Sequence, residues 1–399
     1  MTQLLVVAII WPFAALVLAI RDFSYRNFRI GVLATAVMFG LCIQVYATQT
    51  YQHDLTRNLA LAAVYKDIPW TSIFLERDWF IGISGKLLCY ISDNLRFLAV
   101  CYILIKALLF LRCVRIVIDN ISPATKRIDL LSILAMIFIV AFYDINSLRF
   151  SIASVFFLWC SLEILINQKK WFYVVILAAP FIHYGFWILA PIPVLYLLLK
   201  NRTVLVWIFF VLSIIFSTAT TSIWINGFVE ENMTEEVSRS VSGYASERNL
   251  EMMAEKYAEG ARTGNLNRAI SRSMVDVRNY GVMICVVLFS IYGFRKRKKN
   301  NRLNQLMNFL LIAYSLANIA NSNSQGIRFY LVVAELAVFL LVYLMYQDDM
   351  FCVEFYKKHK TFIKIMFYLV IITAVMYLVI GRNGLNLIGV IFGNYFLHL

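Results

Sequence analysis

Charged residues are scarce in this sequence. Only 15% of its 399 residues are Asp, Glu, Lys or Arg, against about 25% in an average soluble domain, while 61% are hydrophobic. Apolar runs long enough to cross a hydrocarbon layer of about 30 Å recur along the whole chain, and no soluble core could absorb them all. The composition therefore excludes a soluble globular protein and predicts an all-α, polytopic transmembrane helix bundle.

Several signatures of soluble enzymes are also missing. The sequence has no Gly-rich phosphate loop, no zinc-binding pattern and no serine-nucleophile elbow. Its seven cysteines lie in or beside apolar segments without the spacing of a metal site or disulfide framework, so we interpret them as packing residues. The first apolar run, 4–20, has no basic residue before it and no small-residue cleavage site after it, which favours a retained span over a signal peptide.

The net charge of +14 would suggest nucleic-acid binding in a soluble protein, but most Lys and Arg residues here lie in short loops between apolar runs. Such basic loops mark the cytoplasmic side of a membrane protein, so we expect no nucleic-acid partner. The clusters that we place in the cytoplasm are Arg21/Arg26/Arg29, Arg112/Arg115/Lys126/Arg127, Lys169/Lys170, Lys200/Arg202, Arg295 to Lys299 with Arg302, and Lys357/Lys358/Lys360/Lys364.

Keeping all these clusters on one side requires an even number of crossings between neighbours. Two apolar runs must then turn back: 128–166 at the polar patch 144–149, and the proline-containing run 171–199 at His183-Tyr184-Gly185. We expect about 12–13 spans, with the N-terminus in the periplasm. The predicted spans are 4–20, 28–48, 95–111, 128–143, 148–166, 171–183, 186–199, 203–222, 279–294, 306–320, 328–346 and 361–380, with 385–398 as an optional last one.

Two segments need separate interpretation. Residues 79–92 are too few to span and begin with aromatic residues, which predicts an interfacial or re-entrant helix. Lys106 lies inside the third span, and we expect its side chain to snorkel to the cytoplasmic end.

The predicted domain organisation is a single membrane domain over 1–399 with one larger periplasmic helical insertion, 226–277, between the eighth and ninth spans. Arg268 and Arg272 lie four residues apart in its basic second part, and therefore on one helix face. Arginine pairs suit phosphate recognition because the planar guanidinium makes paired hydrogen bonds to oxyanions. The alternative is a solvated amphipathic helix on the membrane surface.

The remaining ionisable groups fall on the side predicted to face outward. Arg149 opens the fifth span, Arg328 opens the eleventh, and His183 lies at a hairpin turn. Charges at membrane depth are costly and usually line a water-filled cavity or substrate path, which predicts an outward-facing polar cavity. The plainer alternatives are arginines that snorkel to the headgroups and a histidine that only packs.

The segment from Asn146 to Leu199 resembles the signature of the EpsG/Wzy family of polysaccharide polymerases. It reads N-S-L-R-F-S-I-A at a span opening, Q-K-K-W at a cytoplasmic turn, and F-I-H-Y before a proline-rich helix. The stretch 76–91, E-R-D-W-F-I-G-I-S-G-K-L-L-C-Y-I, is similar to the family's region before a helix, and Asp54 to an aspartate of its first outer loop. G-I-R-F at 326–329 resembles the family's late R-F at a span entrance.

The resemblance implies a GT-C-like membrane glycosyltransferase. Such proteins join undecaprenyl-pyrophosphate-linked oligosaccharide repeat units on the outer face of the bacterial inner membrane. No cofactor or metal is expected, because the donor is already an activated glycosyl pyrophosphate. The implied partners are the lipid-linked donor and acceptor glycans, membrane lipids, a chain-length regulator and a flippase.

This reaction assigns roles to the outward-facing residues. Arginines preorganised near the leaving pyrophosphate would stabilise its developing charge, and the acceptor hydroxyl needs a general base within hydrogen-bond reach. We expect Arg149 and Arg328 to bracket the pyrophosphate and favour His183 as the base. The full set is Arg149, Arg328, Arg268, Arg272 and Arg278 for pyrophosphate, His183, Asp54 and Glu76 as base candidates, and Tyr244, Tyr257 and Tyr280 for stacking on sugars.

Three alternatives stay open. A lipid-linked oligosaccharide flippase should show repeats and short loops, and the sequence has no repeat and one loop of about fifty residues. An O-antigen ligase has neighbouring chemistry, although the F-H pattern favours a polymerase. A membrane O-acyltransferase would carry its histidine in a helix facing an acyl-donor tunnel, and not at an outer turn.

Overall fold

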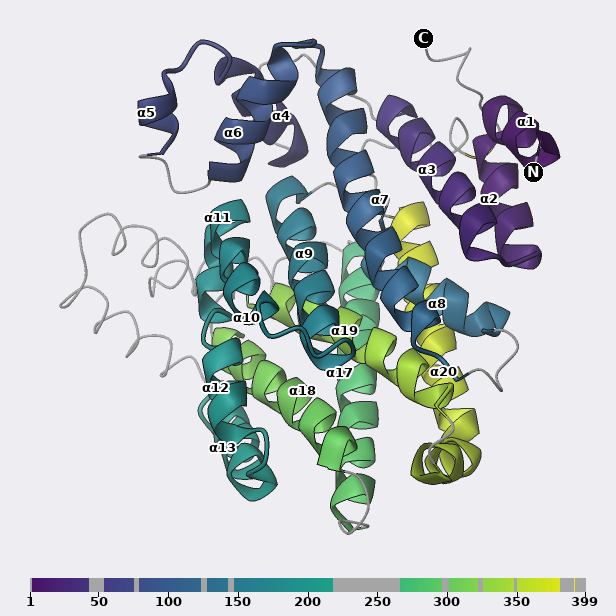
Figure 1. The fold of residues 1–399 in the computed structure, drawn as a ribbon, viewed down its shortest axis with the longest axis vertical. Helices are drawn as coiled ribbons and strands as arrows, with labels where there is room; N and C mark the ends of the chain where they lie inside the picture. Colours follow the sequence, from purple (N-terminus) through teal and green to yellow (C-terminus); the bar gives the residue numbers. More distant parts are fainter. Residues whose placement is uncertain are drawn as a thin grey trace. The chain divides into compact units, whose positions relative to one another are not determined.

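The computed structural model describes residues 2–42, 54–74, 79–122, 128–142, 147–217, 266–295, 301–321, 326–347, 350–380 and 391. Every element in these ranges is a helix, which confirms the predicted all-α class (Figure 1). Six of these helices are long and apolar enough to cross a membrane, and seven further apolar helices are shorter. The protein is therefore a multi-pass membrane protein, while the total of about 12–13 spans stays a prediction.

The chain divides into two compact units, each considered separately below. Unit 1 comprises Met1–Ala190, Val342–Asp348 and Gly381–Leu399, and unit 2 comprises Pro191–Leu341 and Asp349–Ile380. The single membrane domain expected over 1–399 stays a prediction. The helices of unit 1 are α1 (Thr2–Ile10), α2 (Pro12–Arg21), α3 (Tyr25–Cys42), α4 (Asp54–Val64), α5 (Trp70–Ile73), α6 (Trp79–Cys89), α7 (Leu95–Asp119), α8 (Leu130–Val140), α9 (Leu148–Leu165), α10 (Phe172–Val175), η1 (Ile176–Ala178), α11 (Ala179–Ile182) and η2 (Tyr184–Ile188).

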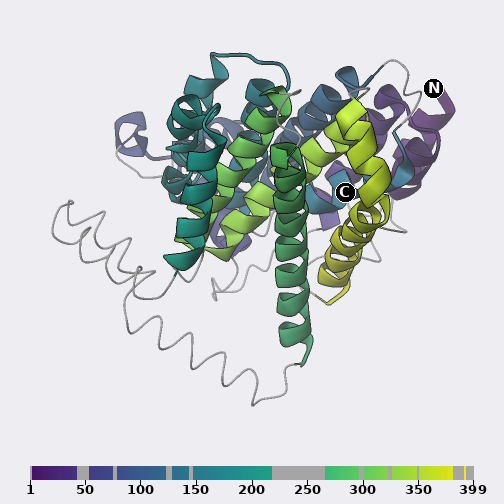
Figure 2. The same ribbon diagram turned by 90° about the horizontal axis from the view of Figure 1, so that it is seen from below.

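Unit 2 is built from fewer and longer helices. Helices α17 and α20 pack together, and α18 contacts α12, α13 and α17. Figure 2 shows the first turns of α17 projecting past its neighbours in this unit. The helices are α12 (Ile192–Leu199), α13 (Thr203–Ile215), α17 (Leu266–Arg295), α18 (Asn301–Ala320), α19 (Ile327–Met345, up to Leu341 in this unit) and α20 (Met350–Ile380).

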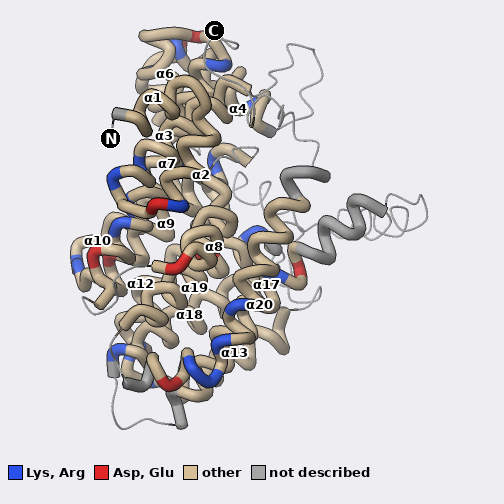
Figure 3. Tube along the Cα trace, turned by 90° about the vertical axis from the view of Figure 1, so that its right-hand side faces the viewer, with Lys and Arg blue, Asp and Glu red and all other residues tan. Residues whose placement is uncertain are grey.

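The exposed face of α20 agrees with its length and composition, which make it a candidate membrane span. Its exposed large apolar side chains recur every three or four residues and therefore form one stripe along the helix. They are Phe362, Ile365, Tyr368, Ile372 and Val375. Figure 3 shows Lys and Arg in a few clusters along the described helices, with most of the tube uncharged.

Several predicted boundaries are corrected by the structure. The first predicted span, 4–20, is broken at Trp11, and Pro12 begins α2, where a proline's missing N–H is no loss. The predicted span 128–143 is only α8, which ends at Ala141 in the left-handed conformation (φ 45°, ψ 60°). Helix α17 begins at Leu266, inside the predicted insertion 226–277, whose earlier residues lie outside the described ones.

The helices of unit 1 approach closely where small residues face each other. A Cβ atom on Gly40 of α3 would lie 2.7 Å from the Cα atom of Val100 on α7, so only glycine allows this contact. Helix α7 also packs along α9. At one end of this bundle, α4, α5 and α6 form a layer beside the first turns of α7, where α4 also contacts α9 and α6 contacts α11 (Figure 1).

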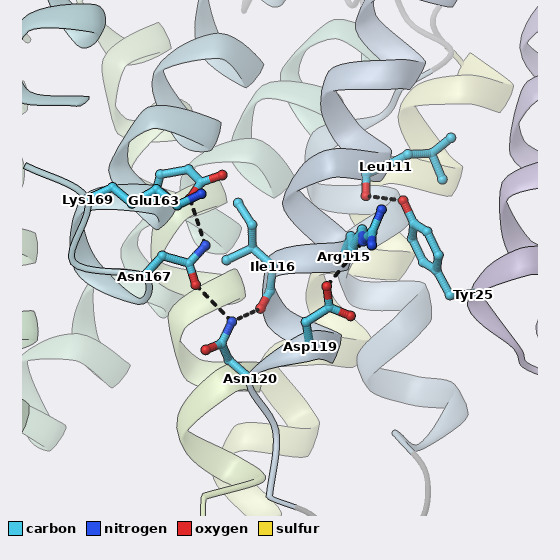
Figure 4. Close-up of polar contacts among 9 residues, drawn as sticks. All are labelled: Tyr25, Leu111, Arg115, Ile116, Asp119, Asn120, Glu163, Asn167 and Lys169. Carbon is cyan, nitrogen blue, oxygen red and sulfur yellow. Dashed lines mark hydrogen bonds and ion pairs between the residues drawn. The ribbon is translucent and has the colours of Figure 1, made fainter. Parts of the chain in front are cut away.

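A polar cluster links the carboxyl end of α7 to the carboxyl end of α9 (Figure 4). Glu163 is 1% exposed and pairs with the Lys169 ammonium at 2.9 Å. The Asn167 amide donates to the same carboxylate at 2.7 Å and accepts at 3.0 Å from the Asn120 amide. The predicted basic turn at 169–170 is thus held against the span by a buried carboxylate that the sequence analysis did not single out.

Candidate active site

The predicted site residues divide into those whose side chains are described and those whose side chains are not. Glu76, Tyr244 and Tyr257 lie outside the described residues. Asp54 begins α4, and Arg268 and Arg272 lie in the first two turns of α17, where the structure gives their helical backbone positions only. The remaining five fall into two groups. Arg149 and His183 belong to unit 1, and Arg278, Tyr280 and Arg328 belong to unit 2.

The first group forms around His183. Helix α11 ends at Ile182, and His183 has an extended backbone (φ −148°, ψ 117°), which confirms the predicted break at this point. The His183 ring meets the Phe150 ring edge-on, with 5.4 Å between centroids and 89° between planes. Phe150 directly follows the half-buried Arg149 in the first turn of α9. The structure therefore brings the start of α9, with Arg149, beside His183.

Aromatic residues enclose this group from the α6 side. The rings of Trp79, the first residue of α6, and Phe181 stack with centroids 4.5 Å apart and planes at 27°. The sequence analysis noted the aromatic start of this segment but did not assign Trp79 to the site. We call Trp79, Arg149, Phe150, Phe181 and His183 the His183 group.

Contacts between α7 and the residues that follow α8 show how far along α7 the end of α8 lies. The Lys106 ammonium donates a hydrogen bond of 2.9 Å to the Ala141 carbonyl, and Lys106 is only 3% exposed. The expected snorkelling of Lys106 to the cytoplasmic end is therefore wrong. Phe142 stacks on Phe110 one turn further along α7, with 5.5 Å between centroids. Because Lys106 follows Leu95 by 11 residues, α8 ends about 16 Å along α7 from its start.

The start of α9 lies at a similar depth. The Cys113 sulfur contacts the Val155 carbonyl oxygen at 4.0 Å, and Asn120 bonds Asn167 further on, so α7 and α9 run in the same direction. Arg149 precedes Val155 by six residues on α9, and Lys106 precedes Cys113 by seven residues on α7. Because the two helices run in the same direction, Arg149 and Lys106 lie at similar levels along them. Arg149 is therefore recessed well below the start of α7.

The second group, in unit 2, forms around Tyr330. The rings of Tyr280 on α17 and Tyr330 on α19 lie 5.7 Å apart, and Tyr330 follows the exposed Arg328 by two residues. Arg278 is 8% exposed, and its Nε donates to the Asn279 side-chain oxygen at 3.2 Å. The Tyr280–Tyr330 contact thus brings the segment that carries Arg278 and Tyr280 close to the start of α19, which carries Arg328. We call these three residues with Tyr330 the Tyr330 group.

Hydrogen bonds between helices fix the orientation of Tyr330. Its hydroxyl donates to the Asn318 side-chain oxygen, and the Asn318 amide donates to the Ser213 hydroxyl at 2.8 Å. The Ser217 hydroxyl donates to the Asn318 backbone carbonyl at 2.6 Å. This chain links α19 through α18 to α13. The sequence analysis missed these residues, because single polar residues inside apolar runs show no pattern until the helices are packed.

Gly326 determines where α19 begins. A Cβ atom at this position would overlap the Ala320 carbonyl at the end of α18, so no other residue fits without a shift. The glycine of the G-I-R-F motif therefore allows a close approach to the end of α18 just before α19, whose first turn carries Arg328. In this motif, the glycine allows its backbone to approach the end of α18 closely, and the arginine provides the positive charge.

Arginines beside aromatic rings suit a substrate that is both a phosphate and a sugar. The guanidinium fork matches phosphate oxygens, and aromatic rings present apolar faces on which sugar rings can lie. The fold defines an all-α polytopic membrane protein.

Comparison with known sequences gives the family. Residues 85–388 match the profile of the EpsG family, so the chain belongs to the EpsG family, as the quoted motifs predicted. The match includes Arg149, His183 and the whole Tyr330 group, and begins after Trp79. No curated protein and no solved structure matches the chain. Membership of this family supports a polysaccharide-polymerase function of the glycosyltransferase kind.

Proposed function

We propose that this protein is a metal-independent glycosyltransferase that joins undecaprenyl-pyrophosphate-linked oligosaccharide repeat units on the outer face of the inner membrane. The observation that carries this proposal is the recessed position of Arg149 beside His183, within a chain that belongs to the EpsG family. A charged group at that depth indicates a polar substrate path.

The reaction explains why arginine is needed. The acceptor hydroxyl forms a bond to the anomeric carbon of the donor glycan, and the bond from that carbon to the pyrophosphate oxygen breaks. The pyrophosphate leaves on its lipid with the electron pair, and the hydroxyl proton passes to a base. The arginines stabilise the charge that grows on the leaving group, because preorganised donors act strongly where water is excluded.

The described residues divide these tasks. We propose that Arg149 and Arg328 bind lipid-linked pyrophosphate, supported by the nearly buried Arg278 and by Arg268 and Arg272 on the first turns of α17. Tyr280 is 41% exposed, so one ring of the Tyr330 group is available to a sugar, and Tyr244 and Tyr257 are proposed to assist it. Asp54 and Glu76 are the carboxylate candidates for the base.

Deletion of the gene, followed by electrophoresis of the cell's lipid-linked glycans, tests the proposal. A polymerase predicts that the glycans collapse to one repeat unit and that the wild-type gene restores long chains. A flippase would instead leave repeat units on the cytoplasmic leaflet. A ligase would leave full-length polymer on undecaprenyl pyrophosphate. Wild-type chain lengths, with no glycan accumulating on undecaprenyl pyrophosphate, would contradict all three.

A further inference from the structure

We propose that His183 acts as a hydrogen-bond donor, through its Nε2–H, to an oxygen of lipid-linked pyrophosphate, and that it is not the general base. This inference rests on the proposed function for the identity of the substrate. It departs from the role that the sequence favoured for His183.

The first observation is the bond that His183 already accepts. The backbone N–H of Gly185 donates to His183 Nδ1, with 3.1 Å between the two nitrogen atoms. A ring nitrogen that accepts a hydrogen bond carries no proton, and a neutral imidazole holds its single proton on the other nitrogen. The Gly185 bond therefore selects the tautomer with the proton on Nε2, which makes Nε2 a donor.

The second observation is that the local fold imposes this arrangement. His183 is the N-cap of η2, and its side chain accepts from the second residue of that helix, as Asn or Ser does in other caps. Phe150 and Phe186 meet the imidazole edge-on at 5.4 and 6.2 Å, with interplanar angles of 89° and 81°. Cap and rings together fix the direction of the Nε2–H bond.

The base role conflicts with this geometry. To take a proton, His183 would have to use Nδ1, the atom that accepts from Gly185, and the cap would break at each turnover. A neutral Nε2–H donor leaves the cap intact.

The same surroundings identify the acceptor atom. Phosphate oxygens at neutral pH only accept hydrogen bonds, and they accept most strongly from an arginine together with a second donor. Arg149 directly precedes Phe150, whose ring contacts His183, so the backbones of Arg149 and His183 lie in neighbouring segments of unit 1. A pyrophosphate oxygen can use both donors.

Two amide substitutions test separately the capping role of His183 Nδ1 and the donor role of its Nε2–H. In His183→Asn the side-chain oxygen can replace Nδ1 as the acceptor for Gly185, but no group reaches the position of Nε2. In His183→Gln the longer side chain can place an amide N–H near that position. The reference variant is His183→Ala, which has neither group.

The experiment measures the affinity of full-length protein in lipid nanodiscs for undecaprenyl pyrophosphate without sugar, with thermal stability recorded for each variant. We expect about tenfold weaker binding for His183→Asn at wild-type stability, and His183→Gln within about threefold of wild type. If His183→Asn binds undecaprenyl pyrophosphate with wild-type affinity, the histidine only caps η2 and the proposal is overturned. Binding by His183→Gln as weak as by His183→Ala, at equal stability, would also overturn it.

This measurement does not depend on catalysis. If the protein binds the lipid pyrophosphate as described but forms no polymer, the proposed function fails and the donor role stands. If polymer forms but affinity is indifferent to position 183, the proposed function stands and the donor role fails.

Discussion

The Lys106 ammonium donates to the Ala141 carbonyl at 2.9 Å and thereby holds the end of α8 deep in unit 1. Ala141 has a left-handed backbone that a side chain makes unfavourable, so neighbouring contacts must stabilise it. A positive charge at the carboxyl end of a helix also complements the helix dipole. The end of α8 is thus held by a buried cation on α7.

Replacing Lys106 by methionine should therefore destabilise the protein by about 1–3 kcal/mol, because a part-buried carbonyl loses its charged donor. Thermal unfolding in detergent measures the effect. Lys66→Met is the matched control: Lys66 and its partner Asp93 are 45% and 66% exposed, and such a surface pair is worth about 0–1 kcal/mol. Equal melting temperatures for the two variants would contradict the anchoring role of Lys106.

A second prediction concerns the turn before α19. Gly326→Ala should shift the start of α19 and displace Arg328, so polymer formation should fall severalfold in protein that still inserts into the membrane. Gly281→Ala is the matched control, because a Cβ atom there meets nothing within 4 Å and alanine stabilises a helix by about 0.5–1 kcal/mol. If both variants polymerise like wild type, Gly326 does not position the arginine.

A third prediction distinguishes phosphate binding from topology. Arg149→Lys and Arg328→Lys should each lose at least about tenfold in polymer formation, because lysine offers a point charge in place of a planar fork. Arg96→Lys, an exposed change in the first turn of α7, should have little effect. Near-normal polymer from both lysine variants in purified, inserted protein would indicate arginines that only snorkel, since lysine does that equally well.

A fourth prediction concerns the direction of the chain around His183. Reporter fusions after Tyr184 should be active as periplasmic alkaline phosphatase, and fusions after Arg202 should be inactive. Basic residues such as Lys200 and Arg202 favour the cytoplasmic side. If both fusions report the same side, the predicted hairpin is wrong and His183 cannot act on an outward-facing substrate.

Long apolar helices could be predicted closely from the sequence. Helix α9 begins at the predicted Leu148, and α19 begins within one residue of its predicted start, because each follows a polar turn directly. Helices α17 and α20 start 13 and 11 residues earlier than the predicted spans, at Leu266 and Met350. Polar helical turns outside the membrane resemble loops when hydropathy is the only guide.

The site was less predictable, because its geometry depends on contacts between distant segments. The end of α8 at Ala141 is set by Lys106 on another helix, and the neighbouring apolar residue Phe142 gave no reason to end a span there. The tautomer of His183 depends on a backbone N–H two residues later, which residue types alone do not indicate. The residue types were enough to choose the candidate site residues, but the role of each one depends on contacts that appear only when the helices pack.

Reconstitution tests the central claim most directly. Purified protein in liposomes is mixed with undecaprenyl-pyrophosphate-linked repeat units in the presence of a metal chelator, and both glycan length and free lipid pyrophosphate are measured. A polymerase predicts chains of many repeat units, with one undecaprenyl pyrophosphate released for each linkage formed. Repeat units that move between leaflets while their length stays at one, with no lipid pyrophosphate released, would contradict the account.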